Sequence, residues 1–88
     1  RYDEAETLHL RSLEMKKKVL GPEHPTVAVG LSGLADLYAR TQRMPLAIET
    51  VSAGIELLES SVGAEHPHSE YLRGQRSEFE DMVSKKAK

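Results

Sequence analysis

Histidine is the side chain best suited to bind a transition metal or to transfer a proton near neutral pH, and the chain contains four. His66 and His68 are separated by a single proline, and His24 lies 42 positions before His66. Two exposed imidazoles without a third ligand make a poor transition-metal site. His24 and His66 each stand in the short sequence Glu-His-Pro, so we interpret them as parts of a repeated turn. The sequence therefore predicts no metal site and no cofactor.

Carboxylates are the other groups that could carry out catalysis. A hydrolytic or transfer reaction needs a nucleophile beside its base, or two carboxylates with different pKa values in one pocket. The chain has no cysteine, which also excludes disulfide bonds and cysteine-bound zinc. The acidic residues fall instead at expected helix starts and outer faces: Asp3, Glu4, Glu6, Glu14, Glu49, Glu56 and Glu59. Water or a nearby lysine satisfies them there, so the sequence predicts a protein that is not an enzyme.

Length and composition place the chain among small soluble globular domains. It has 88 residues, of which 39% are hydrophobic and 30% charged, and a formal net charge of -2. This charge gives no broad basic field for a phosphate backbone, so nucleic acid is not an expected partner. The sequence contains no run of about 18 apolar residues and no signal-peptide pattern. We therefore expect no membrane partner and a cytoplasmic location.

One five-residue segment occurs twice in the chain. Gly-Pro-Glu-His-Pro at 21–25 returns as Gly-Ala-Glu-His-Pro at 63–67, an offset of 42 residues. The same offset aligns other positions, such as Leu13 with Ile55. A fixed period of this length is typical of a repeat array, in which each unit needs its neighbours to bury its apolar face.

Between these segments, apolar residues recur at helical spacing and predict four helices. The first expected helix covers residues 3–20 of an outer segment that spans 1–20. A complete helix pair over 25–62 follows, with helices at 25–41 and 45–62. The fourth helix is expected at 67–84, and a tail at 85–88. The stripes that the first three helices would bury are Ala5, Leu8, Leu13, Val19 and Leu20; Val27, Leu31, Leu34, Ala35 and Tyr38; and Ala47, Val51, Ile55, Leu58 and Val62. Gly54 lies inside the third helix, where glycine costs about 1 kcal/mol against alanine, so close helix packing is its natural reason.

The fourth expected helix differs from the second. Its apolar stripe is Tyr71, Leu72, Gln75, Phe79, Met82 and Val83. The second helix shifted by 42 positions predicts a stripe that begins at Ser69 and ends at Glu80, both of which are polar. The apolar face has therefore slipped by roughly two positions relative to the repeat. We interpret this helix as a degenerate C-terminal capping helix, because the end of a solenoid needs a polar outer face.

These features together resemble the tetratricopeptide repeat of the kinesin light chain type. The matching sequences are YDEAETLHLRSLEMKKKVLGPEHPTVA at 2–28, LSGLADLYARTQRM at 31–44 and the second Gly-Ala-Glu-His-Pro. The resemblance implies an all-α fold of antiparallel helix pairs, stacked as a short right-handed α-solenoid, with 1–20 as the outer helix of a truncated repeat. It also implies non-catalytic binding of a protein or peptide segment, as part of an adaptor or scaffold protein.

In repeats of this type, the first helix of each pair lines a concave groove that holds an extended peptide. By that resemblance, four positions project into the groove: Val29, Ser32, Asp36 and Arg40. Arg73 is a more distant candidate. Arg40 would offer a fork-shaped donor to a carboxylate or carbonyl pair, and Asp36 would orient a basic or amide group. The family commonly has paired asparagines in the inner helix that hold the peptide backbone, and this chain has Ser32 and Gly33 there.

A structural function is the alternative. The chain opens at Arg1 inside a helical pattern, which predicts a piece of a longer array, and the slipped fourth helix favours a terminal segment of that array. The stripe of Ala5, Leu8 and Leu13 would then be only partly covered. An uncovered apolar strip invites self-association.

Overall fold

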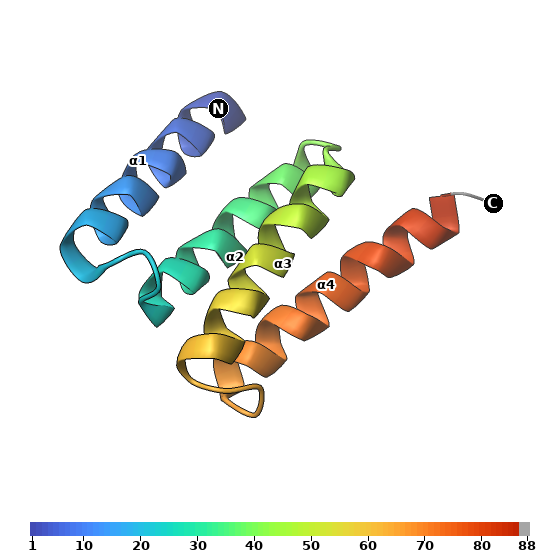
Figure 1. Cartoon of the computed structure of the whole chain (residues 1–88). Helices are drawn as coiled ribbons and strands as arrows, with labels where there is room; N and C mark the ends of the chain where they lie inside the picture. The colour runs from blue at the N-terminus through green and yellow to red at the C-terminus, as the bar shows by residue number, and fades with distance from the viewer. Residues whose placement is uncertain (87–88) are drawn as a thin grey trace.

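The computed structural model describes residues 1–86 and shows an all-α chain of four helices, as the sequence predicts (Figure 1). They are α1 (Tyr2–Leu20), α2 (Pro25–Arg40), α3 (Met44–Ser61) and α4 (Pro67–Lys86). Each expected helix is found, with ends within two residues of the expected ones. The helix α4 extends through Lys86, so the expected tail begins inside it, and residues 87–88 lie outside the described part of the chain.

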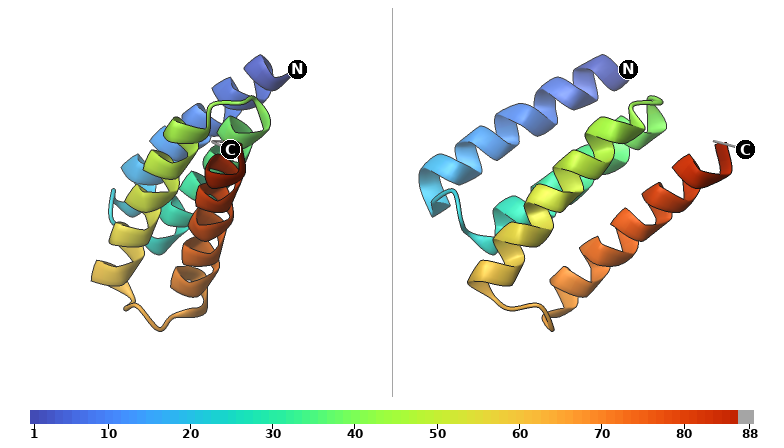
Figure 2. Two further views of the ribbon diagram at one scale, coloured as in Figure 1. Left: turned by 90° about the vertical axis from the view of Figure 1, so that its right-hand side faces the viewer. Right: turned by 45° about the vertical axis from the view of Figure 1, so that its right-hand side comes forward.

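Consecutive helices run in opposite directions and form a single stack. The turned views show α1 at one end of the stack and α4 at the other (Figure 2). Within the described part of the chain, α2 packs against all three other helices, whereas α1 packs only on α2. The stack measures 43 × 33 × 15 Å, so it is a thin slab whose helices are covered on few sides. This is the layout of stacked antiparallel helix pairs that the repeat predicts.

The core lies between α2 and α3. Its buried members are Leu13, Val27, Ala28, Leu34, Ala35, Tyr38, Ala47, Val51, Ile55, Leu58, Leu72 and Phe79. The expected stripes of α2 and α3 are therefore confirmed, except that Leu31 is only partly buried and Val62 is exposed. The expected stripe of α1 is wrong at Leu8, Val19 and Leu20, which are exposed. Within the described part of the chain, α1 packs on α2 alone, so no second helix covers these three residues.

Helices approach closely where a glycine on one faces a leucine on the next. A Cβ on Gly54 of α3 would lie 2.7 Å from Cδ2 of Leu72 in α4, which confirms the packing reason expected for this glycine. At the α1–α2 contact, a Cβ on Gly30 would lie 2.7 Å from Cδ2 of Leu13. Leu72 stands 42 positions after Gly30. At the α1–α2 contact the later helix supplies the glycine, whereas at the α3–α4 contact the later helix supplies the leucine. The helix α4 is thus seated on α3 much as α2 is seated on α1.

The repeated turns have the same backbone geometry. Gly21 has φ 95° and Gly63 has φ 97°, a region that side chains with a Cβ rarely adopt. Each glycine carbonyl accepts a hydrogen bond at 3.3 Å from the backbone N–H of the histidine three residues later. The turn between α2 and α3 places Gln42 at φ 67°, in the left-handed region that residues other than glycine rarely adopt. The 42-residue period therefore fixes local backbone conformation as well as helix length.

Truncation and overpacking of the core test this register. Leu34→Ala should lower the free energy of unfolding by about 2–5 kcal/mol, because Leu34 is buried between α2 and its neighbours. Ala47→Leu should cost about 1–3 kcal/mol, because Ala47 is fully buried and a larger side chain would overpack the helix contact. Urea denaturation of each variant measures both effects. Near-neutral results at both positions would contradict the packing described.

Candidate functional site

A groove of about 520 Å³ runs between α2 and α4. It includes Asp36 and Arg40, two of the four positions that were expected to face a peptide. The residues that line it are Asp36, Ala39, Arg40, Glu70, Tyr71, Gly74, Gln75, Glu78, Phe79 and Met82. Most of them belong to α4, the helix that the sequence analysis interpreted as a cap.

Two hydrogen bonds hold α4 against α2 at the floor of the groove. The Ser32 hydroxyl donates to Oε1 of Gln75 at 2.6 Å, and Nε2 of Gln75 donates to the Ser32 carbonyl at 3.1 Å. Ser32 is only 7% exposed, so its hydroxyl supports the groove from beneath instead of projecting into it. The role of Gln75 was missed from the sequence, although an amide inside an apolar stripe was a signal that it has a buried partner.

Asp36 and Arg40 lie on the groove face of α2, as expected, and pair with each other. Nε of Arg40 donates to Oδ2 of Asp36 at 2.8 Å, across one helical turn. This hydrogen bond, together with the nearby negative charge, raises the pKa of the Arg40 guanidinium. Both side chains are more than half exposed, so the pair contributes little to stability. It does, however, occupy one edge of the guanidinium and offset the Arg40 charge.

Val29 and Arg73, the outlying candidates, lie away from this groove. Val29 is exposed in the first turns of α2. It lines two small pockets, one shared with α1 and the other shared with Tyr71 and Leu72 of α4. Arg73 donates to Glu59 of α3 at 3.2 Å, on another side of α4. The structure therefore brings Asp36 and Arg40 together in the groove, and it places Arg73 outside it.

The groove is lined by acidic side chains and by exposed apolar ones. Three carboxylates line it, those of Asp36, Glu70 and Glu78, against the single guanidinium of Arg40. Tyr71 is 67% exposed and Met82 is also exposed, so apolar surface remains open to a partner. Sequence reasoning missed Glu70 and Glu78 because, apart from Arg73, it placed the groove contacts on α2.

Gly74 lies at the middle of α4 and in the groove. Among the described residues, nothing lies within 4 Å of the place where its Cβ would be, apart from the nearby backbone of its own helix. This distinguishes it from Gly54, where Leu72 fills the space that the glycine leaves. A glycine at an open helix position costs about 1 kcal/mol against alanine. Packing within the chain offers no reason for that cost.

The repeated histidines act as helix caps. Nδ1 of His24 accepts a hydrogen bond from the Thr26 backbone N–H at 3.1 Å, and Nδ1 of His66 accepts one from the His68 backbone N–H at the same distance. The rings of His66 and His68 lie 5.1 Å apart. Within residues 1–85, no group of three or more histidine, aspartate or glutamate side chains is arranged to hold a metal ion. The turn interpretation of His24 and His66 therefore has a physical basis in capping.

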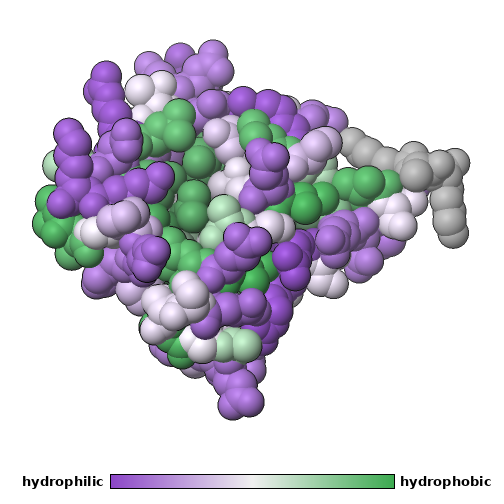
Figure 3. Space-filling model, in the orientation of Figure 1, coloured by the Kyte–Doolittle hydropathy of each residue, from purple (hydrophilic) through white to green (hydrophobic). Residues whose placement is uncertain are grey.

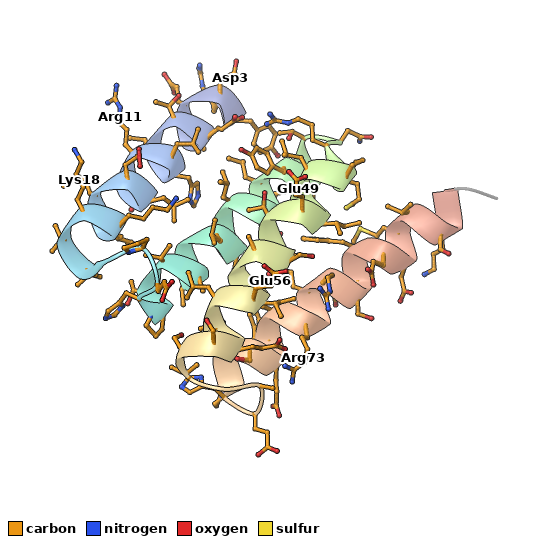
Figure 4. All side chains as sticks on the ribbon, viewed as in Figure 1. Asp3, Arg11, Lys18, Glu49, Glu56 and Arg73 are labelled. Atoms are coloured by element: carbon orange, nitrogen blue, oxygen red, sulfur yellow. The ribbon has the colours of Figure 1, made fainter. Side chains whose placement is uncertain are left out.

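The charged side chains outside the groove lie on the surface or join helices. Figure 4 shows Glu49 and Glu56 on the exposed side of α3, and Asp3, Arg11 and Lys18 pointing away from the stack. Glu6 is an exception, because Arg43 donates to its Oε1 at 2.6 Å and links the α2–α3 turn to α1. This hydrogen bond raises the pKa of Arg43, whose guanidinium also lies 4.7 Å from the centre of the Tyr38 ring. These contacts attach α1 to the stack.

A family model described as tetratricopeptide repeat matches residues 1–69, which include α1, α2, α3 and the second repeated turn. A search of curated proteins finds no match. None of the described helices combines the length and the apolar character that a bilayer crossing requires.

Removal of the Gln75 amide tests the link between α2 and α4. Gln75→Ala should cost about 1–3 kcal/mol in unfolding free energy, because it leaves the part-buried Ser32 hydroxyl and carbonyl without these partners. Ser77→Ala, at an exposed position of the same helix, should stay within about 0.5 kcal/mol of the parent chain. Chemical denaturation compares the two. Equal stabilities for both variants would mean that Ser32 and Gln75 do not hold the helices together.

Proposed function

The chain belongs to the tetratricopeptide repeat family, whose repeats generally act as protein-interaction modules, and on this premise we propose that it binds a segment of another protein in the groove between α2 and α4. The proposed role is non-catalytic. Binding would require only that the groove present complementary surface, because no nucleophile, base or metal cluster needs to be assembled there.

Gly74 is the observation that carries this proposal. Its missing side chain keeps the centre of the groove open, at a cost in helix stability that no contact within the described chain repays. A partner segment that approaches the α4 backbone at this point accounts for the glycine, because any side chain there would occupy the same space. The exposed surfaces of Tyr71 and Met82 supply apolar contact beside it.

We further propose that this module serves an adaptor or scaffold protein of the kinesin light chain type. The repeated Glu-His-Pro turn and the 42-residue period support this assignment. Ser32 and Gly33 stand where that type commonly has paired asparagines. Ser32 is bonded to Gln75, and Gly33 lies against His9. Recognition in this groove would therefore depend on side chains of α4 more than on amides of α2.

A larger side chain at Gly74 tests the proposal. Gly74→Gln should raise the unfolding free energy by about 0.5–1 kcal/mol, because glutamine is the better helix former at an open position. The same change should abolish groove binding. Binding is measured by selecting from a random peptide library on the parent chain and titrating the selected peptides against both proteins. Glu80→Gln, at an exposed position of α4 outside the groove lining, is the control and should bind like the parent.

Amide chemical shifts would identify the surface that any selected peptide contacts. Shifts confined to α2 and α4, and lost in Gly74→Gln, support the proposal. If selected peptides bind the glutamine variant as tightly as the parent, or if no peptide contacts α2 and α4, the groove is not a binding site.

Self-association is a second candidate function, and the surface of α1 favours it. Leu8, Met15 and Val19 are 64%, 66% and 78% exposed and recur at helical spacing on α1. Figure 3 shows that apolar side chains also gather between α1 and α3, on the face that Figure 1 presents. Exposed apolar residues of this kind would favour docking of a second copy or of a further repeat.

Sedimentation equilibrium measures this second candidate directly. The parent chain should show a concentration-dependent dimer, because association removes Leu8 and Val19 from water. The double change Leu8→Ser and Val19→Ser should shift the equilibrium to monomer without loss of helix content, since both side chains are already exposed. A parent chain that stays monomeric at millimolar concentration would remove self-association as a function.

A further inference from the structure

We infer that the groove between α2 and α4 selects a basic, extended segment, with lysine or arginine at two positions four residues apart and an apolar residue midway between them. This inference rests on the proposed function and specifies the chemistry of the partner. Its three contact points on α4 are Glu70, Gly74 and Glu78, which follow one another at intervals of four residues along the groove.

The charges that line the groove determine which charge a partner segment should carry. Asp36 pairs with Arg40 at 2.8 Å and offsets its charge. Glu70 and Glu78 have no cationic partner among the described side chains, so the groove keeps two uncompensated carboxylates. A segment that brought its own carboxylate to Arg40, as the sequence led us to expect, would have to displace Asp36 and approach both glutamates. Like charges at this spacing oppose such a partner.

The spacing of the glutamates sets the spacing of the partner's basic residues. An α-helix rises about 1.5 Å per residue, so Glu70 and Glu78 lie about 12 Å apart along α4, with Gly74 about 6 Å from each. An extended chain rises about 3.3 Å per residue and directs every second side chain to the same face. Side chains at i, i+2 and i+4 of an extended segment therefore match Glu70, Gly74 and Glu78 in position. A basic pair three residues apart would direct its two charges to opposite faces.

The middle position must be apolar because of what surrounds Gly74. The space above the glycine is open, and Tyr71 and Met82 leave exposed apolar surface on the same side of α4. The methylene stems of the flanking lysines would cover this surface further, while their ammonium groups reach the glutamates. An apolar side chain at i+2 can thus be buried between two charge contacts.

The test uses three synthetic nine-residue peptides, acetylated and amidated, in a background of alanine and serine. The first has lysine at positions three and seven and leucine at five. The second has glutamate in place of both lysines, and the third has lysine at three and six, which keeps the charge but changes the spacing. Each peptide is titrated into the 15N-labelled chain, and amide shifts give both the affinity and the surface contacted. The first peptide should bind at α2 and α4 at least fivefold more tightly than either of the others.

Two double variants with equal charge separate local contacts from overall charge. Glu70→Gln with Glu78→Gln should weaken the first peptide about 5- to 20-fold and flatten its salt dependence. Glu65→Gln with Glu80→Gln removes two exposed carboxylates outside the groove lining and should change the affinity less than twofold. Equal losses in the two double variants would overturn the inference, because attraction would then be non-specific.

The outcomes also distinguish this inference from the proposed function. If the library peptides that occupy the groove are acidic or neutral, or if the glutamate peptide binds as well as the lysine peptide, the groove binds a segment but not a basic one. If no peptide of any charge contacts α2 and α4, both the inference and the proposed function fail. Preference for the lysine peptide, lost only in the groove variant, supports both.

Discussion

The groove depends on the contact between Leu72 of α4 and the bare backbone of α3 at Gly54. Leu72 is 1% exposed and fills the space that Gly54 leaves, which brings the fourth helix close enough to α2 for Gln75 to reach Ser32. Apolar contact supplies the attraction, and the two hydrogen bonds set the angular position of α4 about its own axis. With α4 held in this rotation, Glu70, Gly74 and Glu78 face the groove. A different rotation would bury or disperse them, so the chemistry of the surface follows from the packing beneath it.

The central position of α2 explains why the other helices expose so much apolar surface. Because α2 packs against all three other helices, it carries a large share of the core, while α1 contributes only Leu13 as a fully buried side chain. The helix α1 is attached through the contact of Leu13 with Gly30 and through the ion pair of Glu6 with Arg43. A helix held in this way retains a second apolar face. In a repeat array most helices have neighbours on two sides, and α1 has one among residues 1–86.

The sequence was most informative where the constraint is local or periodic. The 42-residue offset predicted the two repeated turns, apolar spacing predicted all four helices, and the small residue at Gly54 indicated a close contact correctly. Periodicity failed at Leu8 and Val19, because it shows which residues share a helix face and not whether a neighbour covers that face. The groove positions implied by the family resemblance included Ser32, whose hydroxyl is instead covered by Gln75, 43 residues later in the chain. Such pairings depend on how two helices are rotated against each other, and one sequence does not contain that information.

The Asp36–Arg40 pair shows why groove position alone does not define a recognition residue. Both side chains were expected to face a partner, and both do lie in the groove, yet each has the other within reach at the helical spacing of four. A partner that binds Asp36 or Arg40 must first replace the existing ion pair, so the net free energy of its contact is small. Glu70 and Glu78 are both acidic and stand eight residues apart, so neither can satisfy the other. Arg73 follows Glu70 by three residues but is bonded to Glu59 of α3. The groups most available to a partner are therefore those that form no ion pair among the described side chains, which moves the proposed recognition surface from α2 to α4.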